Sequence, residues 1–221
     1  MKIRIALLLT ITIAVGIVFS TPGVTAPTPT ATGSWQLNID YNAPRPLLVK
    51  VPGEAEPQLF WYFLYTVTNR TGEERSFSPN IVLYTNTGEI IQAGEGVSPV
   101  VFEKIRSITN NPLLRDQWSI GGKILQGQDN ARDGVAIFRN FDHNATSFDI
   151  FVGGLSGETT SIQLPTPIEV TEEDADGKER KVLKTKVFLT KTMRLNYNIG
   201  TEAAQRLRVK VKLVEQDWVM R

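Results

Sequence analysis

The stretch that decides the fold is "QLFWYFLYTVTNRTGEE", residues 58–74. Alternate side chains of an extended chain point to opposite faces. Both faces of this stretch are apolar, with Phe60, Tyr62 and Leu64 on one and Trp61, Phe63, Tyr65 and Val67 on the other. This pattern is typical of a central strand that is covered on both sides. The Asn, Gly and acidic residues at 69–74 then predict a turn.

Other segments show the alternation of a strand with one buried face. We predict strands at residues 35–41, 47–51, 81–84, 89–92, 120–125, 134–139, 147–152, 161–170, 181–197 and 206–214. Only "SPVVFEKIRSITNNP", residues 98–112, has helical spacing. In it, Ser98 is the expected N-cap, Pro99 lies in the first turn, and Val101, Ile105 and Ile108 share one face.

Short strands, one helix and no regular alternation of strands with helices define the expected fold class. We predict an all-β fold, an immunoglobulin-like antiparallel β-sandwich with one short helix and a long β-hairpin extension. The two longest strands flank an acidic segment, which places the hairpin insertion at about residues 160–197 of a domain covering residues 35–221.

The N-terminal residues have the three parts of an export signal. Lys2 and Arg4 precede an apolar run at residues 5–19, and small and polar residues follow. The run is shorter than the roughly 20 residues that span a bilayer as a helix. We therefore expect residues 1–26 to be a signal peptide or an uncleaved anchor, and residues 27–34 to be a flexible Pro/Thr linker. The expected location is periplasmic, cell-envelope or secreted.

The amino-acid composition limits the kinds of functional site that the chain can form. The chain has no cysteine, which excludes disulfides and thiolate metal sites, and it has a single histidine. We therefore expect no metal and no cofactor. The 24 basic and 23 acidic residues give a net charge of +1, which indicates no partner by itself. Nucleic acid is not expected as a partner, because export would separate the protein from it.

One segment approaches a catalytic motif, "GLSGE" at residues 154–158. A nucleophile elbow requires Gly-x-Ser-x-Gly, but Glu158 stands at the last glycine position. His143 precedes the predicted strand 147–152 and Ser156 follows it, which separates them by tens of ångströms of extended chain. A serine and its base must lie about 3 Å apart. We therefore expect turns here and no enzyme, with a hydrolase as the second alternative function.

Two further motifs have a simple structural explanation. The acidic stretch 171–180 places Glu172, Asp174 and Asp176 at the first ligand positions of a calcium loop, but Leu183 replaces the bidentate glutamate. A solvated hairpin tip is expected, and weak calcium binding stays open. Asn69 and Asn144 meet the N-glycosylation pattern, and we expect both to act in turns.

Basic residues are concentrated toward the end of the chain, with eleven of the 24 lying between Lys178 and Lys212. If the last two predicted strands are neighbours, one sheet face collects Lys184, Lys186, Arg194, Arg206, Arg208, Lys210 and Lys212. Such a face would attract anionic polymers. Alternating charges are also the ordinary solvent side of a sheet and protect an edge strand from aggregation.

Three phrases carry a resemblance. They are "YTVTNRTGEERSFSPNIVLYTNTGE" (65–89), "LQGQDNARDGVAIFRNFDHNATSFDIFVGGLSGE" (125–158) and "DWVMR" (217–221). Together they resemble an uncharacterised family of exported proteins of planctomycete bacteria, and the middle pattern is similar to bacterial extracellular immunoglobulin-like domains. The resemblance implies a sandwich and export, and it implies no activity.

We therefore expect an exported, noncatalytic interaction or structural module of the cell envelope. Its expected partner is an envelope protein or an anionic polymer, with membrane contact only through an uncleaved N-terminal segment. The first alternative is a binder of anionic envelope polysaccharide or lipid headgroups, which would use the seven basic residues.

Overall fold

The computed structural model describes residues 34–174, 177–200, 203–208 and 210–221. The expected signal peptide, the linker up to residue 33, and Asp176 of the acidic tip lie outside the described residues. Among the described residues, no helix has the length and apolar character that crossing a membrane requires.

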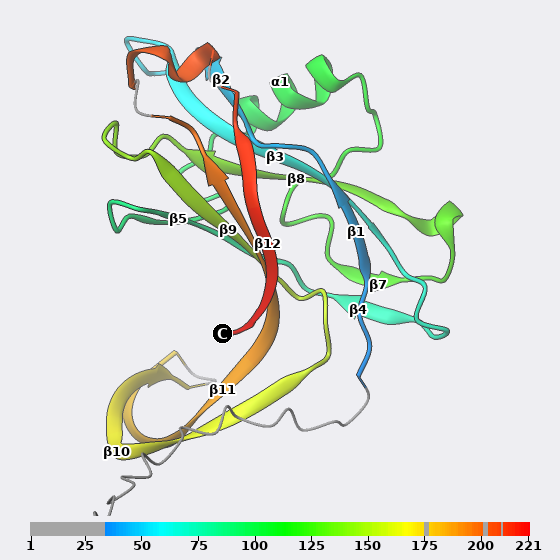
Figure 1. The fold of residues 1–221 in the computed structure, drawn as a ribbon, viewed down its shortest axis with the longest axis vertical. Helices are drawn as coiled ribbons and strands as arrows, with labels where there is room; N and C mark the ends of the chain where they lie inside the picture. Colours follow the sequence, from blue (N-terminus) through cyan, green and yellow to red (C-terminus); the bar gives the residue numbers. More distant parts are fainter. Residues whose placement is uncertain (1–33, 175–176, 201–202, 209) are drawn as a thin grey trace, which may run out of the picture.

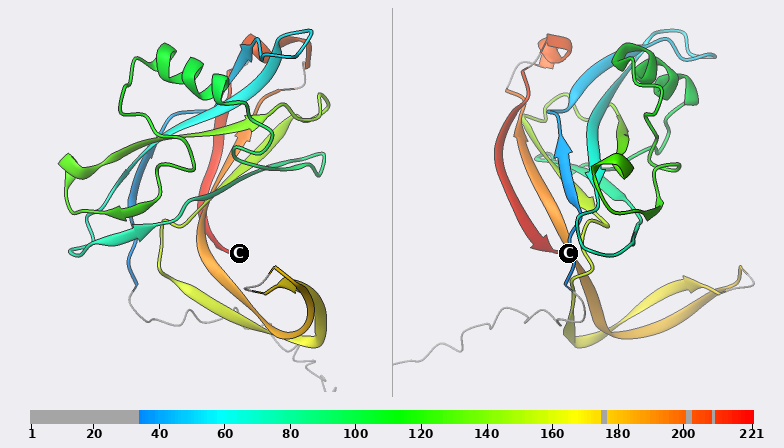
Figure 2. Two further views of the ribbon diagram at one scale, coloured as in Figure 1. Left: turned by 180° about the vertical axis from the view of Figure 1, so that it is seen from behind. Right: turned by 90° about the vertical axis from the view of Figure 1, so that its right-hand side faces the viewer.

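Two antiparallel sheets lie face to face (Figures 1 and 2). The described part of the first sheet has four strands, β1 (Asn38–Tyr41), β2 (Arg45–Val49), β3 (Gln58–Thr68) and β8 (Arg132–Arg139). The second has six, β5 (Asn80–Thr85), β6 (Ile90–Gln92), β9 (Ser147–Gly153), β10 (Thr159–Glu173), β11 (Glu179–Asn198) and β12 (Lys212–Met220). A small sheet pairs β4 (Arg75–Phe77) with β7 (Gly122–Ile124). The predicted all-β sandwich is confirmed.

Strand β3 is the centre of the first sheet and is buried on both faces, as its sequence predicts. It pairs with β1 and β2 along one edge and with β8 along the other. Trp61 and Phe63 belong to the core between the sheets, where Leu83, Ile150 and Leu195 of the second sheet lie. The opposite face of β3 forms a separate core beneath helix α1 (Pro99–Thr109).

Helix α1 covers the outer face of the first sheet. Ser98 is its N-cap, and Asn110 ends it in the left-handed conformation with φ 50°. Val101 and Ile105 are fully buried against Phe60 and Tyr62 of β3. The expectation that Ile108 belongs to the same buried stripe is wrong, because that side chain in the last turn is 47% exposed.

The predicted hairpins have the expected pairing, and the predicted last strand needs a correction. Leu83 of β5 lies opposite Ile91 of β6, and β10 pairs with β11 over most of its length. Residues 206–214 do not form one strand, because the 3₁₀ helix η2 (Ala203–Arg208) occupies the first part and β12 begins only at Lys212. A second 3₁₀ helix, η1 (Gln128–Asn130), precedes β8.

The β10–β11 hairpin extends beyond the sandwich (Figure 2). Residues 193–198 of β11 lie between β9 and β12 in the sheet, and their inward side chains join the core. Arg221, which follows β12, exchanges two backbone hydrogen bonds with Thr190 of β11. Residues 179–189 of β11 therefore pair only with β10 among the described strands.

The outer strand of this hairpin is irregular. Its register with β11 shifts between Gln163 and Ile168. Pro165 and Pro167 lie within the shifted segment, and proline has no backbone N–H for a ladder hydrogen bond. The shift is the physical result of placing two prolines in a paired strand.

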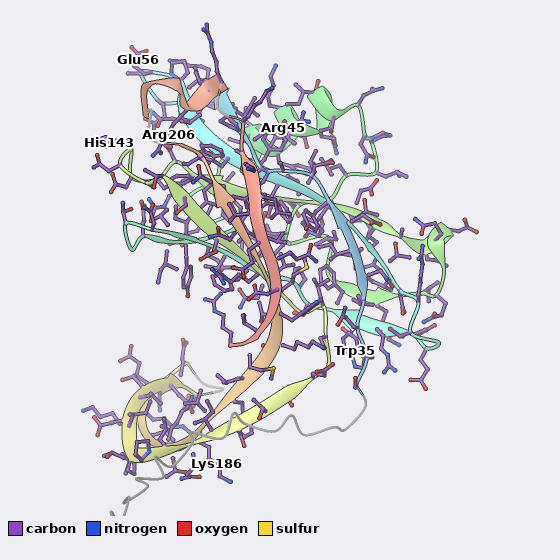
Figure 3. The ribbon with its side chains drawn as sticks, in the orientation of Figure 1. Trp35, Arg45, Glu56, His143, Lys186 and Arg206 are labelled. Atoms are coloured by element: carbon purple, nitrogen blue, oxygen red, sulfur yellow. The ribbon has the colours of Figure 1, made fainter. Side chains whose placement is uncertain are left out.

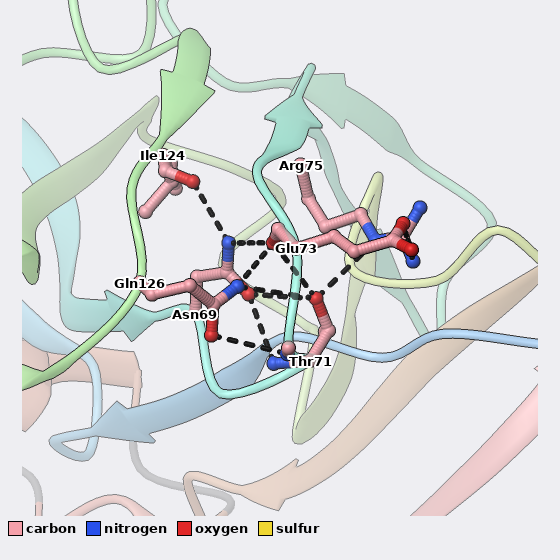
Figure 4. A network of polar contacts seen from close by, with 7 residues as sticks. Asn69, Thr71, Glu73, Arg75, Ile124 and Gln126 are labelled. Atoms are coloured by element: carbon pink, nitrogen blue, oxygen red, sulfur yellow. Dashed lines mark hydrogen bonds and ion pairs between the residues drawn. The ribbon is translucent and has the colours of Figure 1, made fainter.

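Asn69 closes the turn after β3 through a buried polar network (Figure 4). Its side-chain amide donates to the carbonyls of Glu73 and Ile124, each at 2.8 Å, and its carbonyl accepts from the N–H and hydroxyl of Thr71. The side-chain amide of Gln126 donates to the Thr71 hydroxyl and the Glu73 carbonyl, and its carbonyl oxygen accepts from the Gly72 N–H. Asn69 is fully buried, so its role in a turn is confirmed and its amide nitrogen has no room for a glycan.

We predict that Asn69→Ala lowers the free energy of unfolding by about 2–3 kcal/mol, because buried carbonyl and N–H groups lose their partners. Asn144→Ala is the matched control, since Asn144 is exposed and its side-chain amide donates only to Asp142. The control is expected to change stability by less than about 0.5 kcal/mol. Urea unfolding of both variants checks this, and equal losses would contradict the assigned role of the network.

Candidate functional site

The seven basic residues expected on one sheet face are not brought together. Lys186 lies in the projecting hairpin, at the opposite end of the molecule from Arg206 (Figure 3). Arg206 and Arg208 belong to η2 rather than to a strand. Lys212 begins β12 opposite Asn198 of β11. The expected single cationic sheet face is therefore wrong, because η2 replaces half of the strand that would have formed it.

Arg194 is committed to structural ion pairs. Its Nε donates to Asp149 at 3.1 Å, and its terminal nitrogen lies 3.5 Å from Glu215 and 3.6 Å from Asp217. Burial lowers the pKa of Arg194, but these carboxylates, Asp149 foremost, raise it above its ordinary value. The guanidinium therefore links β11 to β9 and β12, and three carboxylates offset its charge.

Arg206 is also structural, and it holds η2 against the loop before β9. The side chain is 6% exposed. It donates to the backbone carbonyls of Phe141 at 3.0 Å, Ala145 at 3.3 Å and Asp142, and its guanidinium lies over the Phe141 ring. Burial lowers its pKa, while Asp142 and Glu89 oppose that shift. This buried guanidinium pins η2 to the loop before β9.

The remaining expected cations differ in their surroundings. Lys184 forms an ion pair with Glu172 at 2.7 Å across the hairpin. Lys186 and Lys212 are exposed and form no ion pair with another described residue.

Arg208 and Lys210 line the same cavity, together with a third basic residue that the sequence pattern did not indicate. They face Arg45, the first residue of β2, across a cavity of about 450 Å³. The remaining lining is Ala43, Pro44, Pro46, Tyr62, Leu207 and Val211. Arg45 stands far away in the sequence, and its only local signal is its position between two prolines in "PRP".

The charged residues that line the cavity are all basic. None of its lining residues is acidic. Within the described part of the chain, Arg45, Arg208 and Lys210 form no ion pair. We call these three residues the cationic triad. They differ from Arg194 and Arg206, whose charges are met by carboxylates or carbonyls.

His143 and Ser156 are not brought together. They lie on either side of β9, whose seven residues span about 20 Å at 3.3 Å each. His143 is exposed. The Ser156 hydroxyl donates to the Trp35 carbonyl and accepts from the Glu158 N–H, both at 3.1 Å.

The glycines around Ser156 have separate roles. Gly154 has φ 85°, a turn conformation that favours glycine. Gly157 leaves space for an aromatic ring, because an added Cβ would lie 2.2 Å from Nε1 of Trp35. The expectation of turn conformations is confirmed at Gly154, whereas Gly157 serves close packing.

The acidic residues considered as metal ligands have other partners. Glu172 pairs with Lys184, and the Asp174 carboxylate accepts from the Lys178 N–H. Among the described residues, no group of three or more His, Asp or Glu side chains is arranged to hold a metal ion. Weak calcium binding at the tip stays a prediction, because Asp176 lies outside the described part.

Comparisons with models of protein families, with curated proteins and with solved structures find no match for this chain. The resemblance to exported planctomycete proteins and the immunoglobulin-like character of the sandwich therefore stay predictions.

We predict that Arg206→Ala lowers the free energy of unfolding by about 2–4 kcal/mol, because three backbone carbonyls lose a charged donor. Arg206→Lys is expected to recover less than half of the loss, since an ammonium group does not reproduce the guanidinium fork. Arg208→Ala, two residues away and exposed, is the control. Denaturant unfolding measures all three, and a stability loss at Arg208 as large as that at Arg206 would contradict the structural assignment.

Proposed function

We propose that the protein is an exported, noncatalytic interaction module of the cell envelope, and that its contact element is the projecting part of the β10–β11 hairpin. We call residues 161–173 and 179–189 the arm. The observation that supports this proposal is the exposure of large apolar side chains on an element that projects beyond the sandwich. The proposed export rests on the charged, apolar and small-residue pattern of residues 1–26.

The arm carries four exposed large apolar side chains, Ile162, Ile168, Leu183 and Phe188. Leu183 is 67% exposed and Phe188 is 75% exposed. An isolated two-stranded hairpin is only marginally stable in water. Covering these side chains with a partner would remove apolar surface from water at about 25 cal/mol per Å². By the register of the hairpin, Ile162 and Leu183 lie on one face and Ile168 and Phe188 on the other, so each face of the arm offers apolar surface that binding of a partner would cover.

The charges of the arm favour a protein partner over an anionic polymer. Lys181 pairs with Glu169 at 2.6 Å and Lys184 pairs with Glu172 at 2.7 Å. Two of its cations are thereby already neutralised. An anionic polymer is held mainly by unpaired positive charge, whereas a protein partner gains from the exposed apolar groups.

A photo-crosslinking amino acid tests the proposal in the cells that make the protein. Placed at position 188, it is expected to give an adduct of discrete mass with an envelope protein. Position 118 is the matched control, because Trp118 is also aromatic and also 75% exposed but lies outside the arm. Neither side chain is part of a buried core, so both variants are expected to fold normally.

An adduct at position 188 that is missing at position 118 supports the proposal. Equal adducts at both positions, or none at position 188, would exclude the arm as the contact element. Fractionation of the same cells tests export separately, and recovery of the folded protein only in the cytoplasm would overturn the envelope assignment.

A further inference from the structure

The cationic triad forms a surface that the arm does not explain. It lies between β2 and η2, at the end of the molecule opposite the arm (Figures 1 and 3). Helix η2 packs against β2 and is fixed by the buried guanidinium of Arg206. The position of Arg208 relative to Arg45 is therefore set by a structural anchor, and the cavity between them is part of the fold.

Like charges repel when they share a cavity, and that repulsion is usually relieved by neighbouring carboxylates. Arg194 shows this arrangement in the same protein, with three carboxylates around one guanidinium. The cationic triad has three positive groups and no acidic residue in its lining. A bound anion would supply the missing negative charge.

The number and type of cations indicate the anion. A carboxylate carries one negative charge, whereas a phosphate monoester carries about −1.5 to −2 at pH 7 and offers three strong acceptor oxygens. Two guanidinium groups match such oxygens in bidentate geometry, and an ammonium group adds a point charge. Three cations are therefore better matched by a phosphate monoester than by a single carboxylate.

The size and the remaining lining indicate more than a phosphate group. The cavity is a groove that is largely open to solvent, and its volume of about 450 Å³ lies within the range of roughly 300–1,000 Å³ of small-molecule sites. Pro44, Pro46, Leu207 and Val211 give it an apolar wall beside the cations. Leu207 is 55% exposed, which leaves apolar surface available for the organic part of a ligand.

We infer that the cavity between β2 and η2 binds a phosphate monoester that carries an apolar group, with Arg45, Arg208 and Lys210 holding the phosphate. This site is independent of the proposed role of the arm. The same chemistry occurs in soluble phosphate esters and in the headgroup of phosphatidic acid, and the test separates the two sources.

Isothermal titration calorimetry with phenyl phosphate tests the site directly. Three charge-assisted contacts predict a dissociation constant below about 1 mM. Arg45→Gln, Arg208→Gln and Lys210→Gln are each expected to weaken binding about tenfold, because each removes one such contact. Raising the salt concentration is expected to weaken binding further. Phenylacetate is expected to bind at least about tenfold more weakly than phenyl phosphate, since its single charge leaves two cations unmatched.

Lys212→Gln is the control, because Lys212 is an exposed cation close in sequence that does not line the cavity. All four substituted side chains are exposed and form no ion pair with another described residue, so circular dichroism is expected to show an unchanged fold. No binding of phenyl phosphate, equal weakening by Lys212→Gln, or equally tight binding of inorganic phosphate would overturn the inference.

Vesicle flotation identifies the natural source of the phosphate. Vesicles of phosphatidylcholine with phosphatidic acid are compared with vesicles of phosphatidylcholine alone. Flotation that requires phosphatidic acid and Arg45 assigns the lipid headgroup, and phenyl phosphate binding without flotation assigns a soluble ester. Crosslinking through position 188 is expected to persist in the Arg45→Gln variant, so the two proposals fail or succeed separately.

Discussion

The fold depends on the burial of both faces of β3. A strand with apolar side chains on both sides needs a covering layer on each. The second sheet covers Trp61 and Phe63, and helix α1 covers Phe60 and Tyr62. Burying one such side chain contributes about 1.5–3 kcal/mol, whereas an exposed ion pair contributes about 0–1 kcal/mol. The arrangement of the layers therefore depends mainly on the aromatic residues of β3, and the exposed ion pairs contribute less to stability.

Most of the secondary structure can be predicted from the sequence, because side-chain periodicity directly reflects which face is buried. The alternation at β5 and β6 and the helical spacing at α1 are local signals. Residues 206–214 show the limit of this reasoning, since their alternation of basic and apolar residues is that of a strand. Arg206 is instead held by carbonyls of residues 141–145, and such a long-range contact leaves no trace in local spacing.

The same limit explains what was missed at the candidate site. Arg208 and Lys210 were recognisable from their charge, but their partner Arg45 lies on a different strand far earlier in the chain. Only the packing of η2 against β2 brings the three together. Charge density along the sequence therefore identifies cations, but the fold decides which are neutralised inside it, such as Arg194, and which face a cavity.

The two edges of the arm have a consequence for self-association. β10 contains Pro165 and Pro167, and proline in an edge strand makes that strand a poor template for pairing with a further chain. On the other side of the arm, residues 179–189 of β11 have no second partner among the described strands. Arg221 pairs with Thr190, the next residue of β11. A filament grows only when each subunit offers two complementary edges. Among the described edges of the arm, strand addition is therefore expected on the β11 side and disfavoured on the β10 side, which opposes growth into a filament.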